Sequence, residues 1–145
     1  MKKLIWTFTW ICIILALFSG CSVKTNYIFL HPTSKITDIE IIKVGTYTDT
    51  NNVEQTILYV ADDIDAFLAG FNDISCYIHF TDPVGVEENT IAIKFIYDNE
   101  EYELVTAHGR ATYTKEHNYE DYQGYRTLNT DEYDEFISQY ILNAD

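Results

Sequence analysis

The stretch Ile36–Tyr47, with the sequence ITDIEIIKVGTY, decides the fold of this chain. It is dense in β-branched residues, which favour strands because their side chains pack well on a pleated surface. Its apolar side chains fall on both faces of such a strand, as expected for a strand inside a sheet. These side chains are Ile36, Ile39, Ile41, Ile42 and Val44. The stretch therefore predicts an inner strand.

The segments that follow predict antiparallel neighbours for this strand. Asp49, Asn51 and Asn52 favour a turn, so we expect Gln55–Val60 to return beside the first strand as a hairpin. Ile74–Thr81 alternates apolar and polar residues, which is typical of a half-buried strand. Further strands are predicted at Thr90–Tyr97, Tyr102–His108, Ala111–Thr114 and Gly124–Leu128.

Two segments have the spacing of amphipathic helices. In the first, which we expect Asp62 to cap, the apolar face consists of Ile64, Phe67, Leu68 and Phe71. We expect Thr130 or Asp131 to cap the second, and its inward side chains are Tyr133, Phe136, Ile137 and Tyr140. The two are either one strand–helix unit used twice or two ordinary acid-capped helices. The sequence predicts an α+β fold, with an antiparallel sheet of about five to seven strands and two amphipathic helices packed on it.

The N-terminus has the three-part layout of a secretory signal peptide. Lys2 and Lys3 precede the apolar run Leu4–Phe18, and two small residues, Ser19 and Gly20, follow it. A membrane-spanning helix needs about 20 apolar residues, which this run does not reach by itself. We therefore expect a signal peptide, and the alternative is an uncleaved N-terminal anchor helix.

The end of this run, Leu17-Phe18-Ser19-Gly20-Cys21, resembles the lipobox of bacterial lipoproteins. Ser19, Gly20 and Cys21 match its pattern, whereas Phe18 stands where leucine is commonest. The resemblance implies that a diacylglyceryl group is attached to the Cys21 sulfur and that the chain is cleaved between Gly20 and Cys21. Two acyl chains give stable anchoring. The expected location is therefore the extracytoplasmic face of the cell membrane, held by lipid.

These features divide the chain into three parts. Residues 1–20 are the expected lipoprotein signal peptide, 21–26 are the lipidated cysteine and a tether, and 27–145 are a single acidic α+β domain. Cys76 is the only cysteine beyond Cys21, so the domain has no internal disulfide. In layout, the chain resembles small uncharacterised lipoproteins of Gram-positive bacteria, whose surface such a disulfide-free domain suits.

The charge of the chain limits its partners. The formal net charge is −14, and without Lys2 and Lys3 it is −16, from 7 basic and 23 acidic residues. A nucleic acid is an improbable partner because no basic patch could neutralise its phosphates. An anionic leaflet would also repel the domain, so the lipid must hold it. A cationic peptide or protein is compatible with this field, although acidity also serves solubility.

The sequence shows no recognisable catalytic or metal-binding pattern. The histidines His31, His79, His108 and His117 lack the spacing of zinc sites, although His79 and His108 could meet across a sheet. Cys76 and His79 would point to opposite faces of their strand. We predict no catalytic residue, no metal and no cofactor, and a protein that is not an enzyme. The alternative is a cell-surface hydrolase with an unrecognised site.

The candidate binding surface is aromatic. It consists of Tyr113, Tyr119, Tyr122 and Tyr125, which surround acids at positions 116, 120 and 121. Tyrosines offer contact area together with a polar tip and are common at interfaces. We therefore predict a non-catalytic binding or accessory module for a cationic peptide, a protein, or a glycan that stacks on the rings. The alternative is that these tyrosines pack a loop onto the sheet.

Overall fold

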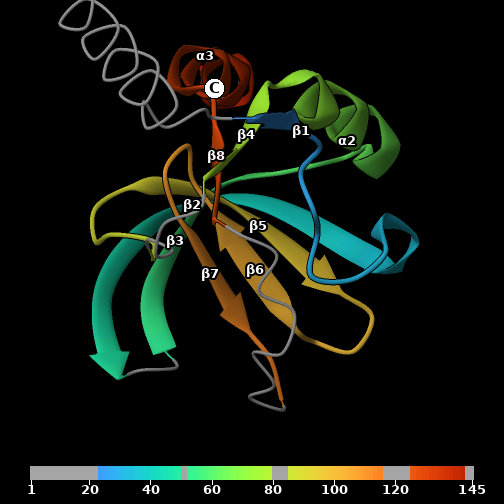
Figure 1. Cartoon of the computed structure of the whole chain (residues 1–145). Helices are drawn as coiled ribbons and strands as arrows, with labels where there is room; N and C mark the ends of the chain where they lie inside the picture. Colours follow the sequence, from blue (N-terminus) through green and yellow to red (C-terminus); the bar gives the residue numbers. More distant parts are fainter. Residues whose placement is uncertain (1–22, 50–51, 80–84, 116–124, 143–145) are drawn as a thin grey trace, which may run out of the picture.

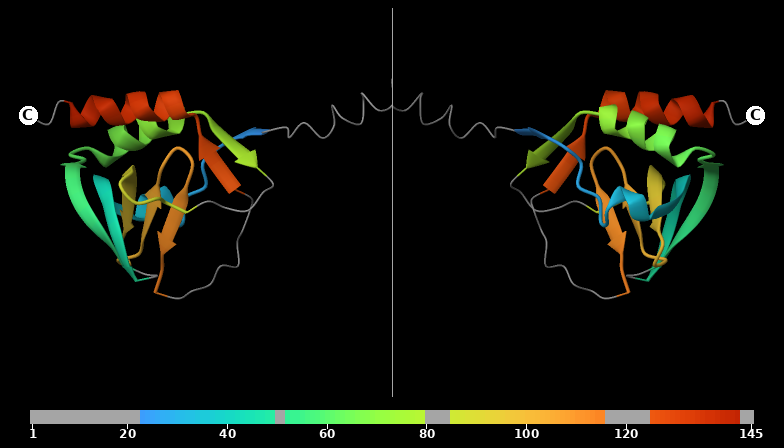
Figure 2. Two further views of the ribbon diagram at one scale, coloured as in Figure 1. Left: turned by 90° about the vertical axis from the view of Figure 1, so that its left-hand side faces the viewer. Right: turned by 90° about the vertical axis from the view of Figure 1, so that its right-hand side faces the viewer.

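The structure is a computed structural model that describes residues 23–49, 52–79, 85–115 and 125–142. Its elements are β1 (Val23–Thr25), the 3-10 helix η1 (Thr33–Lys35), β2 (Ile36–Asp49), β3 (Asn52–Val60), α2 (Ile64–Asp73), β4 (Cys76–His79), β5 (Ile91–Tyr97), β6 (Tyr102–Val105), β7 (Arg110–Tyr113), β8 (Tyr125–Leu128) and α3 (Thr130–Ile141). Figures 1 and 2 show both α-helices on one side of the larger sheet.

The α+β class and the two helices packed on antiparallel strands are confirmed. The strands, however, form two sheets, with the orders β3-β2-β5-β6-β7 and β1-β4-β8. The described residues thus contain eight strands, more than the five to seven expected in one sheet. The difference arises because alternation of side chains identifies a strand and its faces but not its partner.

The predicted inner strand, β2, is paired on both sides. Ile41 lies opposite Tyr59 of β3 and opposite Ile93 of β5. Its two faces join different buried clusters, since Ile39 and Ile41 belong to the core beneath the helices and Ile42 and Val44 to a second core. A strand that is apolar on both faces therefore separates two hydrophobic layers.

The two helices pack closely on each other, and α2 contacts β2 while α3 contacts β3. A Cβ atom at Gly70 of α2 would lie 2.8 Å from Cε2 of Phe136 in α3, so the glycine permits the close approach of the two helices. The helix caps differ from the predicted ones. Asp63, and not Asp62, caps α2 by accepting a hydrogen bond from Ala66 N. Asn129, one residue before Thr130, caps α3 by accepting one from Glu132 N. The strands preceding the two helices, β3 and β8, lie in different sheets.

The smaller sheet includes residues expected in the tether. Val23–Thr25, part of the predicted tether 21–26, forms the edge strand β1, with Val23 opposite Ile78 of β4. On its other side β4 pairs with β8, where His79 lies opposite Tyr125. The folded part of the chain therefore starts by residue 23, which leaves a shorter tether than expected.

The segment Tyr27–His31, here called the strap, crosses the same face of the larger sheet as the helices. The Tyr27 ring packs edge-on against Phe71, and the Phe29 ring against Phe95, with centroids 5.3 and 5.2 Å apart. The strap is therefore docked on the core through its apolar side chains Tyr27, Phe29 and Leu30.

The strap is tied to the sheet by the carboxylate of Glu103 in β6, which is completely buried. Oε1 accepts hydrogen bonds from Leu30 N at 3.0 Å and from the Tyr97 hydroxyl. Oε2 accepts one from the Tyr27 hydroxyl at 3.0 Å and lies 2.6 Å from Nη2 of Arg110. A buried charge is costly unless it is paired and hydrogen-bonded, and both oxygens of Glu103 meet this requirement.

Replacing Glu103 should therefore destabilise the whole domain. Glu103→Gln removes the charge that pairs with Arg110, and we expect a loss of about 3–5 kcal/mol in the free energy of unfolding, measured by urea denaturation. The control is Glu100→Gln, which breaks an exposed ion pair with Lys115 and should cost less than about 1 kcal/mol. Similar losses in both variants would show that Glu103 has no special role.

A second carboxylate holds the end of the strap. Oε2 of Glu101 lies 2.6 Å from Nε2 of His31, and Oε1 accepts a hydrogen bond from Lys115 N at 2.9 Å. The hydrogen bond from His31, followed by that from Lys115, holds the pKa of Glu101 below its ordinary value, although burial opposes this.

This lowered pKa predicts a pH dependence of stability. Because the folded state holds its proton less tightly than the unfolded state, Glu101 contributes stability above the ordinary pKa of about 4.3. That contribution is lost as the pH falls through the lower pKa that Glu101 has in the folded state. We expect Glu101→Gln to reduce stability at pH 7 and to flatten its decline in acid, as measured by urea denaturation between pH 7 and pH 3. Glu135→Gln removes the same charge from an exposed helix position and is the control; an unchanged acid slope in Glu101→Gln would contradict the assignment.

Candidate functional site

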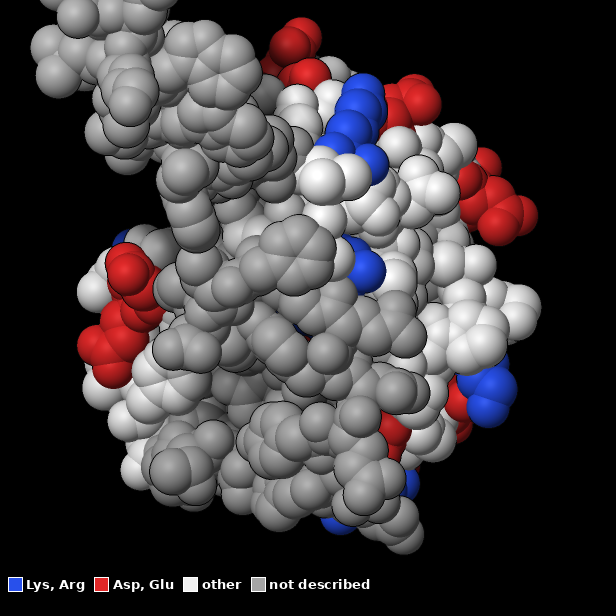
Figure 3. All heavy atoms as spheres, viewed as in Figure 1, with Lys and Arg blue, Asp and Glu red and all other residues white. Residues whose placement is uncertain are grey.

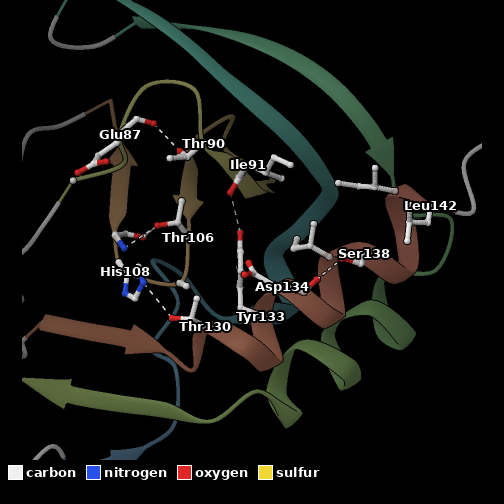
Figure 4. Close-up of a pocket in the computed structure, with 15 residues that line it drawn as sticks. Glu87, Thr90, Ile91, Thr106, His108, Thr130, Tyr133, Asp134, Ser138 and Leu142 are labelled. Carbon is white, nitrogen blue, oxygen red and sulfur yellow. Dashed lines mark hydrogen bonds between the residues drawn. The ribbon is translucent and has the colours of Figure 1, made fainter.

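A groove of about 690 Å³ lies between α3 and two loops of the larger sheet. One loop is Gly85–Thr90, which precedes β5, and the other is the turn Thr106–Gly109 between β6 and β7 (Figure 4). Its volume falls in the range of about 300–1,000 Å³ that is usual for ligand sites. Its lining residues on α3 and in its cap are Thr130, Tyr133, Asp134, Ile137, Ser138, Ile141 and Leu142.

These residues recur at helical spacing, so one face of α3 forms a wall of the groove. Tyr133 fixes that wall, because its hydroxyl donates a hydrogen bond to the Val105 carbonyl at 3.0 Å. Burial raises the pKa of Tyr133, so the hydroxyl keeps its proton and remains a donor. The wall is therefore attached to the end of β6.

The turn Thr106–Gly109 is held by hydrogen bonds at both of its ends. Thr106 N donates to the Gly109 carbonyl at 2.9 Å, and Gly109 N donates to the Thr106 hydroxyl at 2.8 Å. The carbonyl of Ala107 accepts a hydrogen bond from Leu128 N of β8 at 2.8 Å. The turn is thereby fixed between the sheet and the start of α3.

The two loops of the groove meet backbone to backbone. A Cβ atom at Gly109 would lie 2.3 Å from the Gly85 carbonyl oxygen, closer than any side chain permits. A Cβ atom at Gly85 would meet nothing within 4 Å. Only the glycine at 109 is therefore required by this contact.

This asymmetry gives a matched pair of variants. Gly109→Ala should push the loops apart and lower the free energy of unfolding by about 1–3 kcal/mol, as expected for overpacking. Gly85→Ala should leave stability nearly unchanged, because its new methyl group meets open space. Urea denaturation of both variants checks this, and equal effects would contradict the close contact.

The charged side chains that line the groove are both acidic. They are Glu87 and Asp134, and no lysine or arginine occurs among the described lining residues. The last turn of α3 also carries no basic residue, so the partial negative charge of the helix C-terminus is not offset there. The groove therefore favours a cation.

One end of the groove is apolar and partly open to solvent. Ile91 is 39% exposed and Leu142 is 77% exposed, and both belong to the lining. In Figure 4 Leu142 lies toward one end, Glu87 and His108 lie toward the other, and Ile91 lies between them, above Tyr133. The groove can thus take a ligand with an apolar part and a positive part.

The hydroxyl groups in the groove do not form a recognisable catalytic set. Nε2 of His108 lies 3.1 Å from the Thr130 hydroxyl, and the Ser138 hydroxyl donates to the Asp134 backbone carbonyl at 2.7 Å. A hydroxyl nucleophile needs a base in contact with it and a third group that orients the base. Within the described ranges, His108 contacts no carboxylate.

The other sequence candidates lie elsewhere. Nε2 of His79 lies 3.0 Å from the Thr127 hydroxyl in the smaller sheet, so His79 and His108 contact different hydroxyls. In the part of the chain that the structure describes, no three His, Cys, Asp or Glu side chains come close enough to hold a metal ion. Cys76 is buried in the core, where burial raises its pKa. Gly20 and Cys21 lie outside the described residues.

The structure describes the side chain of one of the four candidate tyrosines. Tyr113 is half-buried and stacks on Tyr102, with centroids 4.5 Å apart and an angle of 14° between the rings. Tyr119 and Tyr122 lie outside the described residues, as does the side chain of Tyr125. Tyr113, at the end of β7, is packed against the second core.

The groove was missed by the sequence reasoning, although α3 carries a signal for it. Beyond the inward residues, this segment has two further apolar residues, Ile141 and Leu142. Ile141 packs against the core, whereas Leu142 is 77% exposed and extends the apolar stripe beyond it.

Comparisons of the chain with protein-family models, with curated proteins and with solved structures found no match. In the described ranges, no helix combines the length and the apolar character needed to cross a membrane.

Proposed function

We propose that this chain is a lipid-anchored lipoprotein on the extracytoplasmic face of the cell membrane, whose domain binds a ligand without catalysis. The ligand is a positively charged peptide that also carries apolar side chains. The observation that carries the proposal is the lining of the groove, which combines two carboxylates with apolar side chains and has no lysine or arginine in its described part.

The charges of the groove and of the whole chain act together on such a ligand. A net charge of −14 attracts cations from a distance, and this raises the rate of encounter. At close range, Asp134 and Glu87 would pair with ammonium or guanidinium groups, while apolar side chains of the ligand would cover Ile91 and Leu142. Screening limits the long-range part to about 8 Å at physiological salt, so salt should weaken binding.

The proposed lipid anchor would place the domain where such a ligand accumulates. The lipobox-like sequence ending at Cys21 supports attachment through two acyl chains. Peptides with a basic face and an apolar face accumulate at the membrane interface. A receptor held there by lipid would meet such peptides where their concentration is highest.

Charge reversal in the groove should weaken binding. With a fluorescent peptide of alternating lysine and leucine as the probe, we expect Asp134→Lys to weaken binding about tenfold or more, as measured by fluorescence anisotropy. Glu135→Lys makes the same charge change on the neighbouring residue of α3, which does not line the groove. It should weaken binding much less.

The apolar end can be tested in the same assay. Ile91→Ser removes an exposed isoleucine from the groove, and Ile57→Ser removes one that is 54% exposed on β3. Weaker binding in Ile91→Ser alone is expected. If Asp134→Lys and Glu135→Lys weaken binding equally and neither serine variant does, attraction is a property of net charge, and the groove is not the site.

A further inference from the structure

The strand nearest the expected anchor is part of a rigid sheet. Val23 of β1 lies two residues after Cys21, a distance of at most about 7 Å along an extended chain. β1 pairs with β4 residue by residue, from Val23 opposite Ile78 to Thr25 opposite Cys76. A lipid on Cys21 would therefore hold one corner of the smaller sheet at the membrane surface, with little freedom to turn.

This sheet differs in charge from the rest of the chain. The chain contains 23 acidic residues, yet β1, β4 and β8 contain none. The formally charged residues of these three strands are Lys24 and Arg126, both positive. Figure 3 shows one face of the molecule, and both acidic and basic side chains occur on the described part of that face.

The outward face of the sheet carries the residue types that suit a membrane interface. Lys24 is exposed and lies directly opposite Tyr77 of β4, which is partly exposed. Val23, the neighbour of Lys24 in β1, is 52% exposed and lies on the other face of the strand, opposite Ile78. Tyrosines prefer the headgroup level of a bilayer, and lysines are attracted to anionic headgroups.

We propose that the outward face of the β1-β4-β8 sheet docks on an anionic phospholipid bilayer, with Lys24 and Tyr77 at the headgroups. This inference rests on the lipid anchor proposed above. An anionic leaflet repels the acidic body of the domain but does not repel these three strands, whose charged residues are positive. The domain therefore turns this sheet toward the membrane. The anchor supplies the attachment, and the charge distribution supplies the orientation.

Single tryptophan reporters can measure this orientation. The two tryptophans of the chain are Trp6 and Trp10, and Trp6→Phe with Trp10→Phe gives a background without tryptophan. In this background the full chain, isolated from bacterial membranes, carries either Tyr77→Trp in the smaller sheet or Ile57→Trp on β3. Figure 2 shows these strands on opposite sides of the domain. Both proteins are placed in phosphatidylcholine–phosphatidylglycerol vesicles that contain brominated phosphatidylcholine.

We expect brominated lipid to reduce the fluorescence of the Tyr77→Trp reporter about twofold or more and to leave the Ile57→Trp reporter nearly unchanged. Lys24→Glu should diminish this quenching, whereas Lys43→Glu, an equal charge change at an exposed position of β2, should not. Far-ultraviolet circular dichroism of each variant verifies that it is folded.

Three results would overturn the proposal. In the first, the protein floats with the vesicles while the two reporters are quenched equally or not at all. The lipid anchor is then supported, and the proposed docking face is wrong. If iodide and brominated lipid both fail to quench the Tyr77→Trp reporter, another protein surface covers the sheet. If the protein does not float, the proposed anchor fails as well.

Discussion

The carboxylate of Glu103 joins more parts of this chain than any other described side chain does. Buried completely, it accepts hydrogen bonds from the strap and from β5 and pairs with Arg110 of β7. Because an unpaired buried charge is costly, all of these groups are held in place around the carboxylate. The strap is thereby bound to the face of the sheet that the helices cover, and β6 and β7 are held in register. This constraint links the segment nearest the expected anchor to the core of the domain.

The same strands position the groove. The turn from β6 to β7 touches the Gly85 backbone on one side and β8 on the other, and α3 is attached to the end of β6 through Tyr133. The walls of the groove are thus extensions of the core, which favours a preformed site and lowers the cost of ordering on binding. Acidic and apolar side chains then decide what such a site can hold. A lipid anchor would bring that site to the surface where cationic amphipathic peptides gather.

Local sequence patterns predicted the elements of this fold better than their partners. The β-branched run at Ile36–Tyr47 predicted the inner strand, and the spacing of Ile64, Phe67, Leu68 and Phe71 predicted the first helix. The smaller sheet was not predicted, because pairing between β1, β4 and β8 depends on contacts between distant residues. Glu103 looks like a solvated charge in its local sequence, and its burial depends on Tyr27, 76 residues away. Asp134 and Ser138 likewise resemble a solvated helix face until the two loops are placed beside them.

The most direct test of the account is the intact mass and the membrane fractionation of the expressed full chain beside its Cys21→Ala variant. The account predicts that the wild-type protein is membrane-bound, lacks residues 1–20 and carries the mass of a diacylglyceryl group, and that the variant shows neither the cleavage nor the lipid. If both proteins remain in the membrane at full length without lipid, the N-terminal run is an uncleaved anchor helix, and the lipoprotein assignment is wrong.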